Sequence, residues 1–146
     1  MTNRQWLLAA HPTGPATTDT WRMVETPMPE PGPGQILVRT LWLSLDPYMR
    51  GRMDASKSYA LDPYMRGRIS AAGNYTQGVA VGGVMQGGGV GTVIASNHPG
   101  WAVGDLVESM AFGWQEYAVL SPDLPGAARA NKVDAGLAPP QAALSW

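Results

Sequence analysis

The sequence predicts a single, mostly β domain built as a small barrel or sandwich. Its 146 residues suit one domain. Its 18 glycines and 13 prolines are many for a helical bundle and fit short strands joined by turns. Several short apolar or alternating segments are separated by turn residues, which is typical of all-β folds.

Three strands are predicted in the first third of the chain, over residues 6–10, 20–25 and 35–45. Residues 20–25 alternate apolar and polar side chains, the pattern of a half-buried strand. Residues 35–45 give the strongest strand signal, and Asp46-Pro47 is predicted to end it. The proline-dense stretch 27–34 cannot form a helix or a central strand, so it is predicted to be an extended loop.

The second half of the chain predicts three more strands, over residues 91–95, 106–110 and 114–120. On the last of these, Trp114 and Tyr117 are interpreted as core or cleft-wall residues.

Residues 139–146 look like the start of a helix with prolines in its first turn. We expect this tail to expose apolar surface that promotes self-association or a homodimer, through Ala142, Ala143, Leu144 and Trp146.

Composition excludes several function classes. The formal net charge is −1 and only 14% of residues are charged, which argues against a nucleic-acid-binding surface. The absence of cysteine excludes disulfides and thiolate metal sites and fits a cytoplasmic protein. No apolar stretch approaches the ~20 residues of a membrane span, and residues 6–10 are too short for a signal-peptide core.

An eight-residue segment occurs twice. Residues 45–52, Leu-Asp-Pro-Tyr-Met-Arg-Gly-Arg, recur letter for letter as residues 61–68. Two copies at a short period do not make a solenoid. The repeat therefore indicates a local tandem duplication of a 16-residue unit, residues 45–60 and 61–76, whose origin the sequence leaves open.

These residues carry a family resemblance. Residues 30–39, 43–52 and 84–91, with the shorter motifs at 104–107 and 113–117, are similar to the amino-terminal half of the zinc-independent medium-chain reductases. That family includes alkenal double-bond reductases, prostaglandin reductases and curcumin reductase. The resemblance covers roughly residues 3–144 and implies a mainly β, partly open GroES-like barrel with a few short helices.

The resemblance implies a domain organisation and an activity. Residues 1–138 would form the substrate domain, and residues 139–146 would start a linker helix towards a nucleotide-binding domain that we expect to be absent. The resemblance implies that the full-length protein uses NADP(H) to reduce the C=C bond of α,β-unsaturated aldehydes or ketones. We expect the isolated chain to bind NADP(H) weakly or not at all, because the pyrophosphate loop would be missing. Its expected partner is a small enal or enone, with neither nucleic acid nor membrane.

Tyrosines of the repeat are the candidate substrate-binding residues. A phenolic O–H can donate to a carbonyl oxygen on which negative charge develops. The resemblance implies this role for Tyr48 or Tyr64 and for Tyr59 or Tyr75. Half-buried barrel aromatics are the alternative interpretation, and the catalytic residue stays unknown, since the family's main proton-donor candidate lies in the nucleotide domain.

Cofactor contacts are expected from the residues that follow the repeat's first tyrosine. The candidates are Met49 and Arg50 in the first copy and Met65 and Arg66 in the second. Arginines near the duplicated loop would raise the local positive potential and could meet cofactor phosphates. A solvated loop face explains the same arginines equally well.

Other chemistries are poorly supported. The glycine run 87–91 leads into a predicted strand, so we interpret it as a strand bend or close backbone approach rather than a phosphate loop. His11 and His98 stand beside prolines in predicted turns, and no metal site is expected. No serine lies in a Gly-x-Ser-x-Gly elbow, and Asp46 and Asp62 precede prolines as turn formers do.

Two function classes remain open, with a small-ligand module as a weaker third. The chain is either the substrate half of an NADP(H)-dependent reductase or a truncated barrel that only binds or self-associates. Within the duplication, only one copy can occupy the family position. The second copy keeps the family's spacing to Val84, whereas the first copy continues directly from the strand over residues 35–45, and we lean slightly to the first copy. The surplus residues would then bulge outwards within 53–70 without unfolding the barrel.

Overall fold

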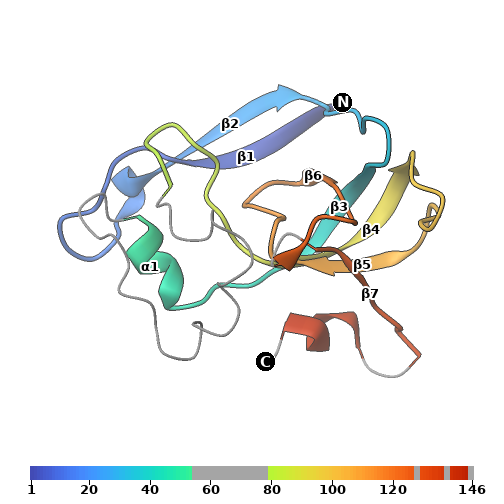
Figure 1. Cartoon of the computed structure of the whole chain (residues 1–146). Helices are drawn as coiled ribbons and strands as arrows, with labels where there is room; N and C mark the ends of the chain where they lie inside the picture. The colour runs from blue at the N-terminus through green and yellow to red at the C-terminus, as the bar shows by residue number, and fades with distance from the viewer. Residues whose placement is uncertain (54–78, 127–128, 137–138, 145–146) are drawn as a thin grey trace.

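The computed structural model describes residues 1–53, 79–126, 129–136 and 139–144. Within these residues the chain is mostly β, with short helical segments between strands (Figure 1). In chain order the elements are β1 (Thr2–Leu8), a 3₁₀ turn η1 (Thr18–Thr20), β2 (Trp21–Pro27), β3 (Ile36–Leu43), α1 (Tyr48–Arg52), β4 (Gly89–Ser96), β5 (Leu106–Ser109), β6 (Tyr117–Leu120), β7 (Asn131–Lys132) and a 3₁₀ helix η3 (Pro140–Leu144).

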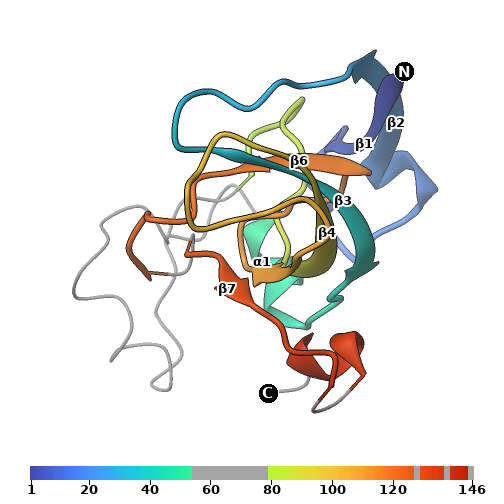
Figure 2. The same cartoon turned by 90° about the vertical axis from the view of Figure 1, so that its right-hand side faces the viewer.

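The strands form two sheets. A five-stranded sheet has the order β6-β3-β4-β5-β7, with all its neighbours antiparallel. β1 and β2 form a separate antiparallel hairpin that lies across one end of the larger sheet (Figure 1). The larger sheet curls around its core (Figure 2), so the fold is the expected mainly β, partly open GroES-like barrel. In the described part of the chain, no helix is long and apolar enough to span a membrane.

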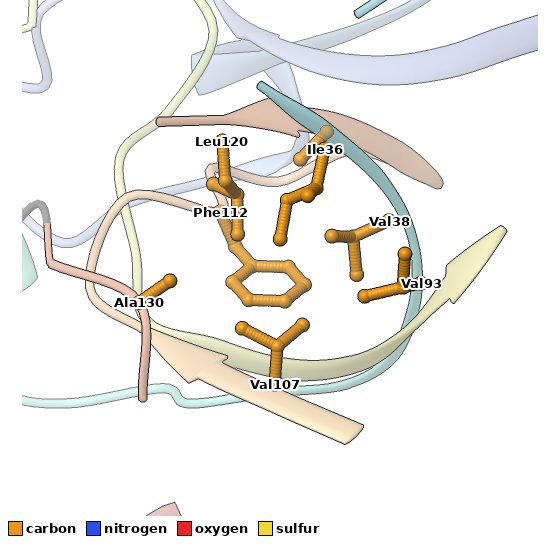
Figure 3. Close-up of a cluster of buried hydrophobic side chains, with 8 residues drawn as sticks. Ile36, Val38, Val93, Val107, Phe112, Leu120 and Ala130 are labelled. Atoms are coloured by element: carbon orange, nitrogen blue, oxygen red, sulfur yellow. The ribbon is translucent and has the colours of Figure 1, made fainter. Parts of the chain in front are cut away.

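Phe112 fills the barrel. It is the only phenylalanine in the sequence, it is fully buried, and it comes from the turn between β5 and β6 rather than from a strand. Figure 3 shows its ring at the centre of a group of aliphatic side chains, which come from β3, β4, β5, β6 and the residue before β7. This cluster comprises Ile36, Val38, Val93, Val107, Ala118, Leu120 and Ala130. One aromatic ring thus occupies the space that the curled sheet encloses.

The glycine run 87–91 enters strand β4 and allows this packing. A β-carbon on Gly89 would lie 2.8 Å from Cγ of Phe112. A β-carbon on Gly91 would overlap the carbonyl oxygen of Arg39 on β3. The interpretation as a close backbone approach is confirmed, because glycine alone leaves room for the neighbouring atoms.

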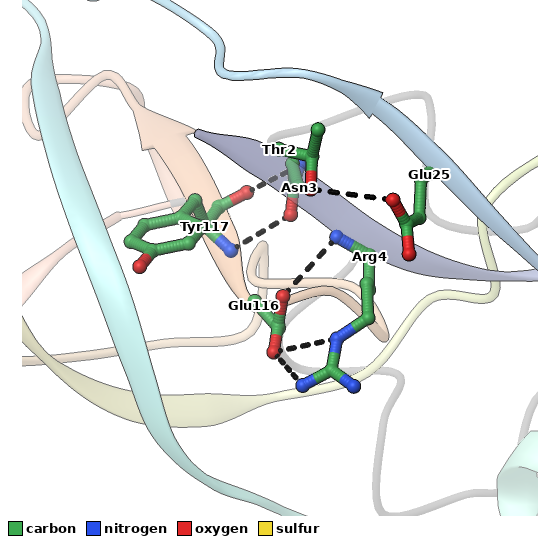
Figure 4. Close-up of polar contacts among 6 residues, drawn as sticks. All are labelled: Thr2, Asn3, Arg4, Glu25, Glu116 and Tyr117. Carbon is green, nitrogen blue, oxygen red and sulfur yellow. Dashed lines mark hydrogen bonds and ion pairs between the residues drawn. The ribbon is translucent and has the colours of Figure 1, made fainter.

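The hairpin is attached to the barrel by a buried asparagine. Asn3 on β1 is 1% exposed, and its Nδ2 donates to the carbonyl oxygen of Tyr117 over 3.0 Å (Figure 4). The backbone N–H of Tyr117 donates to Oδ1 of Asn3, also over 3.0 Å. The side-chain amide therefore bonds β6 as a backbone amide of a neighbouring strand would.

An ion pair lies beside this amide. The Arg4 guanidinium donates to the Glu116 carboxylate (Figure 4), and this side-chain hydrogen bond lowers the pKa of Glu116 below its ordinary value. Since both side chains are solvent-exposed, the pair contributes little free energy. The buried Asn3 amide is therefore the stronger link between the two sheets.

Several element boundaries differ from the sequence-based prediction. β1 begins at Thr2 and ends at Leu8, rather than covering 6–10, because its polar first residues pair with β2. The strand predicted over 114–120 begins only at Tyr117, since the preceding residues belong to the turn that carries Phe112. The two-residue strand β7 and the helix α1 were not predicted.

The tail forms η3, which contacts β4 and β5. Ala142 is exposed, Ala143 and Leu144 are half-buried, and Trp146 lies outside the described residues.

The stretch between Arg52 and Val79 starts and ends at neighbouring positions in the fold. The backbone N–H of Val79 donates to the carbonyl oxygen of Arg52 over 2.8 Å. This hydrogen bond therefore holds together the two ends of the intervening stretch, which contains the second copy. Adding residues between fixed ends raises the loop-closure free energy only slightly, about 0.6 kcal/mol for each doubling of length. The predicted bulge within 53–70 falls almost entirely on residues 54–78, which lie outside the described residues.

We predict that Gly91→Ala destabilises the barrel, because its new methyl group meets the Arg39 carbonyl. The expected loss is about 1–3 kcal/mol of unfolding free energy, as for other overpacked sites. Urea denaturation followed by circular dichroism measures it. Gly14→Ala is the matched control, because no atom lies within 4 Å of a β-carbon there. Equal stability of the two variants would contradict the close approach.

We predict that deleting residues 61–76 leaves the unfolding free energy nearly unchanged. The deletion removes one 16-residue unit and keeps every first-copy residue that contacts the barrel. The measurement is again a urea denaturation curve, compared with that of the intact chain. A chain that no longer folds after this deletion would show that the duplication is an integral element of the domain.

Candidate functional site

The candidate site is the corner that follows β3, defined here as the α1 corner, residues 44–53. The backbone N–H of Ser44 donates to the Gly88 carbonyl over 2.9 Å, and its Oγ donates to Asp46 over 2.5 Å. Pro47 has helical dihedral angles, φ −56° and ψ −31°, and caps the start of α1. Because proline fixes φ near this value, Pro47 favours the start of the helix. β3 already ends at Leu43, before the Asp-Pro pair that was predicted to end it.

Two methionines hold α1 against the barrel. Met49 and Met53 are four residues apart and therefore share one face of the helix. Both are buried, in a second core cluster that also contains Leu8, Val79 and Met85. The unbranched methionine side chain fills irregular gaps of this kind well. These two side chains therefore fix the position of α1 against the cluster.

A pair of tryptophans lies beneath the helix. The rings of Trp21 and Trp114 are tilted by 31°, with centroids 4.7 Å apart. A β-carbon on Gly87 would come within 2.8 Å of Trp114 Nε1 and 3.0 Å of Met49 Cε. The Trp114 Nε1–H is buried without a hydrogen-bond partner among the residues that the structure describes. Trp114 is half-buried and packs against the second core cluster, which agrees with its interpretation as a core or cleft-wall residue.

The arginines of α1 bind parts of the protein itself. Nη2 of Arg50 donates to the carbonyl oxygens of Gly14 (2.7 Å) and Pro12 (3.3 Å). Arg52 is buried, and its Nη1 donates to Gln86 Oε1 over 2.6 Å. Both arginines of the first copy therefore have a structural role. In Arg50, the donors on Nε and Nη1 are not used by these two bonds.

His11 completes the attachment of its loop to α1. Its Nδ1 lies 2.6 Å from the carbonyl oxygen of Met53, so Nδ1 carries the proton and donates. His98, near the far end of β4, accepts from the Gly100 N–H at Nδ1 and donates from Nε2 to Asp123 over 2.9 Å. Both histidines build turns in separate places. Among the described residues, no three His, Cys, Asp or Glu side chains are grouped to hold a metal ion.

The sequence-predicted site residues are only partly placed. Tyr48 is the first residue of α1, Met49 is buried beneath the helix, and Arg50 binds the loop at Gly14. The remaining candidates, Tyr59, Tyr64, Met65, Arg66 and Tyr75, lie outside the described residues. The tyrosine assignments therefore remain proposals.

Sequence reasoning missed the supports of α1. Trp21 and Met85 were noticed only as members of a strand and a glycine-rich stretch, and Gln86 was not singled out. Their role depends on which segments meet in space. The available signals were the resemblance-carrying segments 84–91, which contains Met85 and Gln86, and 113–117, which contains Trp114.

We predict that Met49→Ala lowers the unfolding free energy by about 2–5 kcal/mol, because it leaves a cavity beneath α1. The matched control is Met65→Ala, the same change at the equivalent residue of the second copy. We expect it to cost less, since Met49 already fills the buried cluster beneath α1, where it lies close to Gly87. Thermal unfolding of both variants tests this. An equal or larger loss for Met65→Ala would place the second copy in the core.

Comparison with known proteins identifies the family. Residues 4–61 and 59–125 match the sequence profile of a family described as the N-terminal domain of oxidoreductase. The match thus consists of two overlapping segments, and each contains one complete copy of the eight-residue repeat.

Relatives of known description agree with this match. The chain is 42% identical over 121 residues to the NADPH-dependent curcumin reductase of Escherichia coli, covering 83% of this chain and 30% of the relative. It is 33% identical over 99 residues to an NADP(+)-dependent 2-alkenal reductase of Nicotiana tabacum, covering 68% and 24%.

Solved structures show the same relationship. CurA of Vibrio vulnificus in complex with NADPH superposes with a TM-score of 0.75 at 34% identity, covering 97% of this chain and 35% of that protein. The chain therefore spans about a third of the length of the relatives that it matches. The profile match, the barrel and the Leu-Asp-Pro-Tyr-Met-Arg motif that leads into α1 agree, so the chain belongs to the amino-terminal domain family of the zinc-independent medium-chain oxidoreductases.

Proposed function

We propose that this chain is the substrate-side domain of an NADP(H)-dependent oxidoreductase that reduces the C=C bond of α,β-unsaturated aldehydes or ketones. The observation that carries the proposal is the α1 corner. It presents the family's Asp-Pro-Tyr-Met-Arg motif on a helix held by core packing and side-chain hydrogen bonds. We further propose that the protein works in the cytoplasm and that the isolated chain is inactive.

Rigid placement of the tyrosine is the contribution that we assign to the described residues. In the proposed reaction, NADPH supplies the hydride that adds to the β-carbon, and negative charge develops on the carbonyl oxygen. A tyrosine O–H donating to that oxygen stabilises the charge. Tyr48 begins α1, whose position is set by Met49 below and by Arg50 at the side. We propose Tyr48 for this contact, with Tyr64, Tyr59 and Tyr75 as the other candidates.

We infer that the described residues do not form a dinucleotide site on their own. A pyrophosphate normally binds at backbone N–H groups where a glycine-rich turn opens a helix. Here residues 87–91 open a strand, and even a methyl group on Gly87 or Gly89 would collide with neighbouring side chains. Nη2 of Arg50 already bonds Pro12 and Gly14, which leaves Nε and Nη1 as the donors for any cofactor contact that this residue makes. Met49 is 4% exposed, so we propose that it supports α1 rather than contacting a cofactor.

A second function has one observation in its favour. Large apolar side chains are exposed next to the α1 corner, with Leu45 74% exposed and Leu41 and Trp42 each about two-fifths exposed. Exposed apolar surface promotes association. The alternative is therefore a non-enzymatic barrel that binds a partner or a second copy of itself.

We predict that the isolated chain neither binds NADPH tightly nor reduces an enal, because no described segment can hold the pyrophosphate. The test is a titration followed by NADPH fluorescence, with cinnamaldehyde turnover followed at the NADPH absorbance band. Micromolar affinity accompanied by turnover would contradict the prediction.

Sedimentation velocity distinguishes the two proposed functions further. A monomer across the accessible concentrations disfavours the self-association module. A dimer that Leu45→Ser dissociates favours it, because that change removes the most exposed apolar side chain of the corner.

A further inference from the structure

A cavity of about 550 Å³ lies on the barrel away from the α1 corner. One wall comes from Trp101 in the β4–β5 connection, and the other from residues 122–125 and 129–132. None of its lining residues belongs to the α1 corner or to the cluster beneath it. The volume falls in the range of small-molecule sites, about 300–1,000 Å³.

The walls of this cavity combine apolar surface with fixed charges. Trp101 packs against the barrel core, and the Lys132 ammonium lies 5.2 Å from the centroid of its ring. Lys132 also bonds Asp105 Oδ2 over 3.0 Å. The Ala102 N–H and the Lys132 ammonium lower the pKa of Asp105, which keeps that carboxylate charged. The tryptophan and the lysine are thus held in place without any ligand. Leu124 adds an apolar side chain that is half-exposed.

Arg129 is the lining residue with unused donors. Its guanidinium has no hydrogen bond or ion pair to any residue in the described ranges 1–53, 79–126, 129–136 and 139–144. The other polar groups are engaged. Asn131 Nδ2 donates to Glu108 over 3.0 Å. The carboxylate of Asp123, also on the wall, accepts a hydrogen bond from His98 Nε2. Its side chain is 85% exposed, so solvent screens its charge.

We propose that this cavity binds a small organic carboxylate. The carboxylate pairs with Arg129, whose planar guanidinium matches it with two parallel N–H···O bonds. Lys132 supplies a second positive charge nearby. The apolar body of the ligand packs between Trp101 and Leu124. The site depends on neither NADP(H) nor the proposed reductase activity, so its test is independent of that function.

Benzoate is the probe, and the reporters are the indole N–H signals of the ¹⁵N-labelled protein. The Trp101 signal is assigned from its loss in Trp101→Phe. We expect benzoate to shift the Trp101 signal saturably, with a Kd on the order of 1 mM for so small a ligand. Benzyl alcohol, which keeps the ring and lacks the charge, should shift it at least tenfold less at the same concentration. Inorganic phosphate, which has charge but no apolar body, should also bind at least tenfold more weakly.

Arg129→Gln should weaken benzoate binding about tenfold or more, since the change removes the charge at an exposed position where folding is not at risk. Arg22→Gln, an exposed arginine on β2 outside the cavity, is the matched control and should bind benzoate as the original chain does. The proposal is wrong if benzoate gives no saturable shift, if benzyl alcohol or phosphate binds equally well, or if Arg129→Gln keeps full affinity.

Discussion

The contact between the glycine run of β4 and the turn before β6 is the constraint on which the rest of the structure depends. Three side chains of residues 110–114 press against three successive glycines, Met110 on Gly88, Phe112 on Gly89 and Trp114 on Gly87. In each case a β-carbon would come within 2.8 Å of the side chain. Larger residues at 87–89 would push the turn away from the sheet, so the barrel core and the floor of the α1 corner are set by the same contact.

That contact couples the barrel to the candidate site. Phe112 points into the barrel core, while Trp114, two residues later, lies under α1 against Met49. The same stretch also bonds the hairpin, because the Trp6 N–H donates to the Trp114 carbonyl over 2.8 Å. One turn therefore connects both sheets and the helix. A change in barrel packing would move the helix that carries Tyr48, so core substitutions near Phe112 should be interpreted with the site in mind.

Sequence reasoning succeeded where local patterns carry the structure. The short strand patterns predicted the β class, the stretch over residues 35–45 predicted β3, and the glycine run 87–91 was correctly interpreted as a close backbone approach leading into β4. It failed where a contact joins distant segments. Asn3 replaces a backbone partner with its side-chain amide, and Phe112 sits in a turn that shows no apolar periodicity. For the candidate site, the motif on α1 came from resemblance alone, since neither composition nor spacing indicates which face of a five-residue helix is buried.

The first copy of the repeat forms the helix α1 that follows β3, and we propose that this copy occupies the family position. The eight residues are identical, so side-chain chemistry favours neither copy. The family match reflects this, because each of its two overlapping segments takes one copy. The position after β3 differs, however. The Ser44 N–H bonds Gly88, and this bond places α1 directly at the end of the strand, where Met49 reaches Trp114. The first copy meets this requirement because only residues 44–47 separate its helix from the end of β3. The first copy therefore forms the corner, and Arg52, bonded to Val79, closes the loop behind it.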